Sequence, residues 1–218
     1  VDYGNDQLRL IEPNGVVTTL LPAGTLTNAA GVALSPTGDV YIADFGAAEI
    51  RAFQASPAVA PAWPGGAPTA EAALPVTGLC GTFGTADGDR ATARFTNPAG
   101  VARGASGGIV IADYGSHRIR TMLADTDSTV ATLAGSSQGM SDLVGLSAKF
   151  DGPRDVAVDA AGIVFVADSA NHRVRKIAVD TTVSTLAGTT TGFVDSATPQ
   201  FAEPSGVSLL SGELFLGD

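Results

Sequence analysis

The sequence predicts an all-β fold made of repeated units of short antiparallel strands, and three observations carry this prediction. One hairpin-like stretch recurs along the chain. Glycine is abundant, with 27 residues among 218, and the apolar residues fall in short runs bounded by turn residues. Many short apolar strands joined by tight, glycine-containing turns are typical of all-β architectures.

The recurring stretch is clearest at residues 168–177, which read DSANHRVRKI. A close copy begins at Asp113, looser copies begin at Asp44 and Asp2, and a fifth begins at Asp218, the last residue. All of these aspartates except Asp2 follow a glycine and a short run of β-branched and aromatic residues. Such runs predict buried strands, because these side chains pack well on a pleated surface.

Each repeat contains four predicted strands. The first strand is 31–34, 100–103, 155–158 and 206–209, and the second is 39–43, 108–112, 163–167 and 213–217. The third is 7–11, 49–53, 118–122 and 173–177, and the fourth is 16–20, 76–80, 130–134 and 183–187. Four antiparallel strands in a repeat of about 40–55 residues are the signature of a β-propeller blade.

We predict one propeller domain over residues 1–218. Residues 7–21 supply the third and fourth strands of a blade, and residues 206–217 supply the first and second strands. If these segments pair, they complete one blade and close a four-bladed ring, which removes the exposed sheet edges. The alternative is that the four repeats are part of a larger propeller.

Two kinds of segment interrupt the repeat. Residues 54–75 are a proline- and alanine-rich insertion whose composition favours an extended loop. It contains Trp63, which is either a candidate contact residue or a side chain folded onto the blade edge. The second kind is a longer connection in which we expect an aspartate to cap the loop and a phenylalanine to pack between blades. These pairs are Asp87 with Phe95, Asp142 with Phe150, and Asp195 with Phe201.

Composition argues against several classes of partner. The net charge of −10 repels phosphate backbones, so nucleic acid is not an expected partner. The single cysteine, Cys80, rules out a disulfide within the chain, and we predict that it packs as a small core residue. No apolar run is long enough to span a bilayer, so membrane insertion is not expected.

The segment 153–177 resembles the NHL repeat nearly throughout, and residues 97–122 resemble it well. The copies around Asp44 and Asp2 keep the apolar skeleton but lack the histidine. The resemblance implies a β-propeller, typically of six blades. The family includes RNA-binding propellers, protein-interaction modules, secreted and surface proteins, and a metal-linked peptidyl-amidating lyase.

His117 and His172 are the two histidines of the chain. Two imidazoles could contribute to a metal site. However, both occupy the same repeat position, where other copies carry Asp6 and Ala48. We therefore interpret both histidines as structural rather than metal-binding. The amidating lyases need more histidines than this chain has, which argues against that activity.

Arginine recurs at one position of the third strand, and aspartate recurs at the end of the second. The arginines are Arg9, Arg51, Arg120 and Arg175, and the aspartates are Asp2, Asp44, Asp113 and Asp168. A ring of arginines could bind an anion, and a ring of carboxylates around the axis could bind a cation. We favour structural roles, in which the arginines pair with the aspartates and the aspartates cap the following turn.

We predict a non-enzymatic binding or structural module that contacts a protein partner or neighbouring subunits through a propeller face. The sequence carries no nucleophile elbow and no phosphate-binding loop, and we expect no catalytic residue and no cofactor. The favoured setting is a larger extracellular or surface protein or assembly. The alternatives are a metal-dependent propeller enzyme of the lyase or lactonase type and an RNA-binding propeller.

Overall fold

The computed structural model describes residues 1–35, 38–53, 74–77, 82–123 and 129–218. These residues form three four-stranded antiparallel sheets and two two-stranded ones. The first complete sheet is β3 (Ala29–Leu34), β4 (Val40–Asp44), β5 (Glu49–Phe53) and β6 (Leu74–Thr77). The second is β7 (Pro98–Arg103), β8 (Ile109–Asp113), β9 (Arg118–Met122) and β10 (Val130–Ala134). The third is β11 (Pro153–Val158), β12 (Val164–Asp168), β13 (Arg173–Ile177) and β14 (Val183–Ala187).

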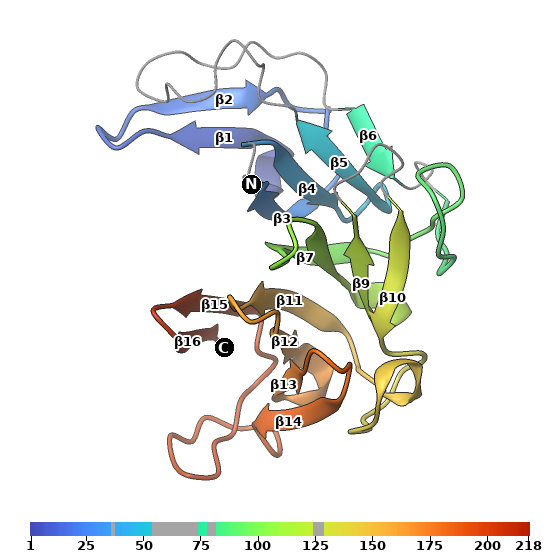
Figure 1. The fold of residues 1–218 in the computed structure, drawn as a ribbon. Coiled ribbons are helices and arrows are strands. Elements are labelled where there is room, and N and C mark those ends of the chain that lie inside the picture. The colour runs from blue at the N-terminus through green and yellow to red at the C-terminus, as the bar shows by residue number, and fades with distance from the viewer. Residues whose placement is uncertain (36–37, 54–73, 78–81, 124–128) are drawn as a thin grey trace.

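The sheets stand around a common centre as the blades of a propeller (Figure 1). The first strand of each blade (β3, β7, β11 and β15) lies innermost, and the fourth lies toward the outside. The second strands β4 and β8 are buried along their whole length. Their continuous apolar character follows, because both faces of a central strand pack against a neighbouring blade.

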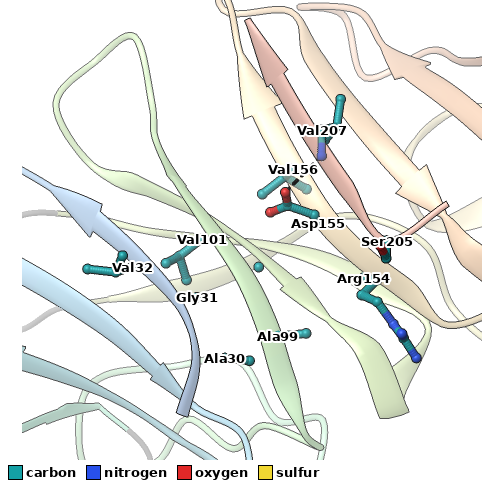
Figure 2. A pocket seen from close by; sticks show the side chains of 11 residues that line it. Ala30, Gly31, Val32, Ala99, Val101, Arg154, Asp155, Val156, Ser205 and Val207 are labelled. Carbon is teal, nitrogen blue, oxygen red and sulfur yellow. Dashed lines mark hydrogen bonds between the residues drawn. The ribbon is translucent and has the colours of Figure 1, made fainter. Parts of the chain in front are cut away.

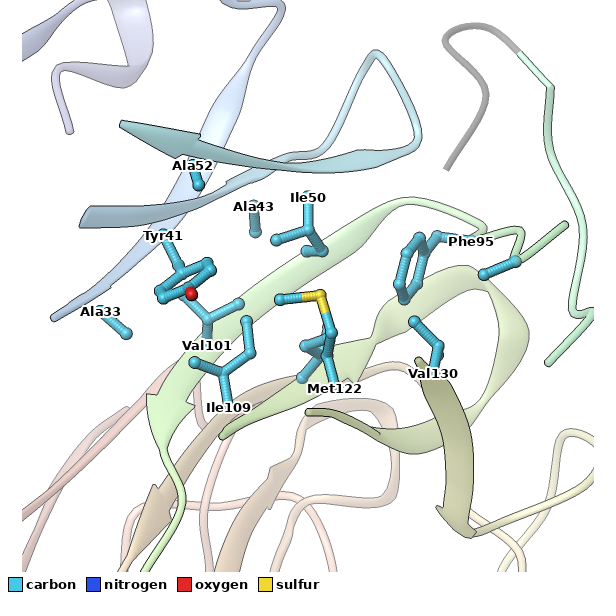
Figure 3. Packing of buried hydrophobic residues seen from close by; sticks show 12 residues of the cluster. Ala33, Tyr41, Ala43, Ile50, Ala52, Phe95, Val101, Ile109, Met122 and Val130 are labelled. Carbon is cyan, nitrogen blue, oxygen red and sulfur yellow. The ribbon is translucent and has the colours of Figure 1, made fainter. Parts of the chain in front are cut away.

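The hydrophobic core is divided into clusters that lie between adjacent blades. The cluster in Figure 3 joins Tyr41 and Ile50 of one blade to Ile109 and Met122 of the next. Phe95, which ends the connection between these two blades, is fully buried in the same cluster. Phe150 occupies the equivalent place between the second and third complete blades. The predicted packing of these two phenylalanines between blades is confirmed.

Short 3₁₀ turns join the second and third strands. They comprise η1 (Tyr3–Asn5), η2 (Tyr114–Ser116) and η4 (Ser169–Asn171). A further turn, η3 (Gly145–Ser147), lies in the connection before β11. Among the described residues, no helix is long and apolar enough to cross a membrane.

The ring is not closed by the two ends of the chain. β1 (Leu8–Ile11) pairs only with β2 (Val17–Leu21), and β15 (Gly206–Leu210) pairs only with β16 (Glu213–Gly217). These two-stranded sheets are separated in Figure 1 and share no ladder. The closed four-bladed ring that the repeat phase allowed is therefore not formed.

The insertion differs from its predicted bounds at one end. β6 begins at Leu74, so two residues of the predicted insertion 54–75 belong to the fourth strand of the blade. β6 thus begins two residues before the predicted strand 76–80, of which residues 78–80 lie outside the described residues. Trp63 and Cys80 lie outside the described residues.

Candidate functional site

The repeated arginine of the third strand is the centre of a buried polar network. Arg120 is fully buried, and its Nη1 donates to Asp113 Oδ2 at 3.2 Å. Its Nη2 donates to Asp87 Oδ1 at 2.6 Å, and the guanidinium lies 5.3 Å from the centre of the Phe95 ring. One arginine thus ties together β8, β9 and the connection that enters the blade.

The next blade repeats this network. Arg175 is fully buried and donates to Asp168 Oδ2 at 2.8 Å and to Asp142 Oδ1 at 2.5 Å. Its guanidinium lies 5.2 Å from the centre of the Phe150 ring. Both guanidinium groups are buried and pair with carboxylates through Nη1 and Nη2, so neither faces an anion from solvent.

The first complete blade builds the network with a different acid. Arg51 pairs with Asp44 at 2.9 Å and with Glu49 at 2.5 Å, and both carboxylates are buried. The connection that enters this blade, residues 22–28, contains no acidic residue. Glu49 therefore supplies the second carboxylate that Asp87 and Asp142 supply elsewhere. Reasoning from the repeat missed Glu49, although the short connection and the acid beside Arg51 were both visible in the sequence.

The strand-end aspartates hold the entering connection in place. Asp113 Oδ1 accepts the Thr96 N–H at 2.8 Å, and Asp168 Oδ1 accepts the Asp151 N–H at 2.8 Å. Asp44 Oδ1 accepts the Thr27 N–H in the same way. All three carboxylates are fully buried.

Burial raises the pKa of the strand-end aspartates. Loss of hydration raises the pKa of Asp113 to about 6, although the Ser116 hydroxyl, the Thr96 N–H and Arg120 all oppose the shift. The same desolvation raises the pKa values of Asp44 and Asp168. The charged networks therefore hold the strands and connections of a blade together, while their buried carboxylates lose hydration.

The connection aspartates do not cap their own loops, which differs from the sequence-based expectation. Asp87 Oδ2 accepts the Thr132 N–H at 3.1 Å, and Asp142 Oδ2 accepts the Thr185 N–H at 3.0 Å. Both threonines belong to the fourth strand of the blade that the connection enters. The other oxygen of each carboxylate, Oδ1, accepts from the buried arginine of the same blade. Asp195 lies exposed on the corresponding connection.

The two histidines join one blade to the next. His117 and His172 adopt left-handed backbone conformations with φ of 58° and 55°. His117 Nδ1 accepts the Gly152 N–H at 3.1 Å, and His172 Nδ1 accepts the Glu203 N–H at 3.2 Å. An accepting Nδ1 places the proton of a neutral imidazole on Nε2. The described residues contain no group of three or more His, Cys, Asp or Glu side chains that could hold a metal ion.

The innermost strands border a cavity of about 470 Å³ that is partly open to solvent (Figure 2). Its apolar lining includes Val32, Val101, Val156 and Val207. Asp155 also lines it, and its Oδ2 accepts the Val207 N–H at 2.9 Å. Desolvation raises the pKa of Asp155. In the sequence Asp155 is one residue of the predicted strand 155–158, and only the structure places it at the cavity.

The outer surface carries a group of exposed aliphatic side chains, which we call the 143–179 patch. It consists of Leu143, Val144, Leu146 and Val179, which are between 50% and 72% exposed. Backbone hydrogen bonds join its two segments, because the Gly145 N–H donates to Thr181 O and the Val183 N–H donates to Leu143 O, both at 2.9 Å. The patch is therefore held on ordered backbone.

Comparison with known proteins supports the fold and identifies the repeat. The family model for the NHL repeat matches residues 95–121 and 150–177. No curated protein matches the sequence. An auxiliary nutrient binding protein from Bacteroides thetaiotaomicron matches with a TM-score of 0.70 and 17% identity, over 98% of this chain and 51% of that one. This chain therefore spans about half the length of that structure.

Two further solved structures share the architecture at lower identity. A virginiamycin B lyase from Staphylococcus aureus matches with a TM-score of 0.54 and 8% identity, over 99% of this chain and 71% of that one. A putative gluconolactonase matches with a TM-score of 0.54 and 14% identity, over 87% and 55% of the two chains. Similarity at this level concerns the fold alone. Residues 95–121 and 150–177 match the NHL repeat and lie in blades of a β-propeller.

Proposed function

We propose that the chain is a non-enzymatic binding module that recognises a protein partner through its surface, with the 143–179 patch as the contact. The patch is the observation that carries the proposal. Exposed apolar side chains that cluster on ordered backbone mark protein interaction sites more often than singly scattered ones do. The burial of Arg120 and Arg175 removes the two most promising anion-binding groups, which weakens the RNA-binding alternative.

The sequence of the connection explains why the patch is confined to one blade. At the positions of Leu143, Val144 and Leu146, the preceding connection carries Gly88, Asp89 and Ala91, which expose little apolar area. The blade fold does not require large aliphatic residues at these positions. Their presence in one repeat therefore favours a role in contact with another molecule.

The partner should combine an apolar anchor with basic surroundings. The apolar anchor would cover Leu143 and Leu146, which are 50% and 61% exposed. The net charge of −10 favours a basic partner, because complementary charge accelerates association and disfavours wrong partners.

The test compares proteins retained by the immobilised wild-type chain with those retained by a Leu143→Ser/Leu146→Ser variant. Ile11→Ser/Leu210→Ser is the matched control, since these residues are 72% and 66% exposed outside the patch. We expect one partner to be retained by the wild type and the control and lost by the patch variant. Equal retention by all three chains would contradict the proposal.

A further inference from the structure

An acidic residue occupies a position of the innermost strand where the other blades carry glycine. Gly31, Gly100 and Gly206 are equivalent to Asp155 in the repeat. Two of these glycines are required by close packing, since a Cβ on Gly31 would lie 2.4 Å from Ala99 O. A Cβ on Gly100 would lie 2.3 Å from Asp155 Oδ1. Asp155 is thus a departure from the repeat at a position that is closely packed in two of the other blades.

The Asp155 carboxylate has no cationic partner among the described residues. Its interactions are with the Val207 and Val156 N–H groups, and no positive charge contributes to them. The adjacent Arg154 points away from Asp155 in Figure 2. Its guanidinium lies 5.5 Å from the centre of the Tyr114 ring. A carboxylate that lines a cavity without a counter-charge is available to a cation from outside the protein.

The other groups that line the cavity indicate which kind of cation would fit it. Valines from β3, β7, β11 and β15 line the cavity together with Asp155 (Figure 2). Each of these strands is the inner edge of its sheet, so its backbone carbonyls on that side have no strand partner. An ammonium group carries three donors and can bond one carboxylate and neighbouring carbonyls together.

We propose that the cavity binds a small primary amine, with its ammonium group on Asp155 and its aliphatic body against the valines. A volume of about 470 Å³ accommodates a compact molecule of this kind. The desolvation that raises the pKa of Asp155 is offset when a cation arrives, so binding should weaken as the pH falls and the carboxyl is protonated. This inference is independent of the 143–179 patch.

Cyclohexylamine is the probe, and its neutral isostere cyclohexanol is the comparison, each titrated into the whole chain by calorimetry at pH 7.5. Asp155→Asn removes the charge and keeps an oxygen that can accept the Val207 N–H. Gly206→Leu tests the site by placing a bulky side chain beside the carboxylate, since a Cβ there lies 4.0 Å from Asp155 Oδ2. Asp195→Asn makes the same charge change at an exposed position and is the control.

We expect the Kd for cyclohexylamine to rise by about tenfold or more in Asp155→Asn and Gly206→Leu and to stay unchanged in Asp195→Asn. Cyclohexanol should bind at least about tenfold more weakly than the amine. A parallel titration with Nα-acetyl-lysine amide distinguishes a lysine side chain of a protein from a free amine, according to which binds more tightly. No saturable amine binding by the wild type, or equal binding by Asp155→Asn, would overturn the proposal.

Discussion

Arg120 Nη2 lies 2.6 Å from Asp87 Oδ1, although 33 residues separate them in the chain. The same contact recurs between Arg175 and Asp142, again across 33 residues. This relationship fixes the long connection against the blade that it enters. It also assigns the most conspicuous charged residues of the repeat to architecture, which directs the search for function to the residues that differ between repeats.

Replacing Arg120 should be among the most destabilising changes in the chain. Arg120→Met leaves Asp113 buried without its counter-charge, and breaking a buried pair in this way costs about 3–5 kcal/mol. Arg9→Met is the matched control, because Arg9 pairs with Asp2 at 3.3 Å and is 43% exposed. The control should cost at most about 1 kcal/mol. Urea unfolding measures the free energy of unfolding of both variants. Similar losses in the two would show that burial does not determine how much an arginine–aspartate pair contributes to stability.

Glu49 should be energetically coupled to Arg51. Glu49→Ala leaves Arg51 with Asp44 alone, and we expect a loss of about 1–3 kcal/mol in the free energy of unfolding. A double-mutant cycle with Arg51→Met isolates the pair. The expected coupling energy is about 1 kcal/mol or more. Additive effects of the two substitutions would refute the assignment of Glu49 as a replacement for the connection aspartate.

The histidine links can be tested by conservative replacement. His117→Ala removes the acceptor of the Gly152 N–H, and leaving that group unpaired costs about 1–3 kcal/mol. His117→Asn offers a side-chain oxygen and tolerates the left-handed backbone, so it should restore part of the loss. Alanine is itself compatible with this backbone, because Ala48 adopts φ of 57° at the same repeat position. Equal stability of the alanine variant and the wild type would show that the link is dispensable.

The free energy of unfolding should rise as the pH is lowered from about 7 to 5. Burial raises the pKa of Asp113 to about 6 from an ordinary value of 3.8, so the folded chain binds this proton more tightly than the unfolded chain does. The stabilisation is complete below the unfolded pKa and is lost as the pH rises through the folded pKa, with a size on the order of 3 kcal/mol. Thermal unfolding at several pH values measures this pH dependence. High salt in these experiments screens the surface charges.

The control for this pH dependence is Asp113→Asn, whose side chain does not titrate. Its unfolding free energy should depend less steeply on pH than that of the wild type. Asp44 and Asp168 also have raised pKa values, so part of the slope should remain. A wild-type chain that loses stability between pH 7 and 5 would contradict the raised pKa.

The glycines of the innermost strands predict a contrast between neighbouring blades. In Gly100→Ala, the new Cβ would lie 2.3 Å from Asp155 Oδ1 and 2.8 Å from the Arg154 carbonyl oxygen. Because backbone must move to relieve this overlap, we expect a loss of about 1–3 kcal/mol. In Gly206→Ala the new Cβ would make only an ordinary contact with Asp155 Oδ2, at 4.0 Å, so the change should be close to neutral. Thermal unfolding of both variants checks the contrast, which equal melting temperatures would refute.

Local pattern allowed most strands to be predicted, because apolar runs bounded by turns depend on neighbours in sequence. Residues 213–217 and 173–177 were predicted with the bounds that β16 and β13 have. The placement of Phe95 was also predictable, since an apolar residue between blades must be buried. The side-chain partners that lie far apart in the sequence could not be predicted. The bonds of Asp87 to Arg120 and Thr132 depend on how a connection folds over the following blade, which residue spacing does not specify.

The candidate sites were less accessible to sequence reasoning than the fold. Asp155 looked like one residue of a strand until the structure placed it beside Gly100 in the central cavity. Leu143 and Leu146 looked like ordinary loop residues, because exposure depends on what covers a side chain. The repeated His117 and Arg120 drew attention for their chemistry, yet the structure gives both of them bonds to neighbouring segments.

The most direct test of the proposed function is partner retention by the folded Leu143→Ser/Leu146→Ser variant. Its urea midpoint should match that of the wild type, because both side chains are at least half exposed. The account predicts that the partner held by the wild-type chain is lost from this variant and kept by Ile11→Ser/Leu210→Ser. Undiminished retention by the patch variant would contradict the claim that the 143–179 patch is the binding surface.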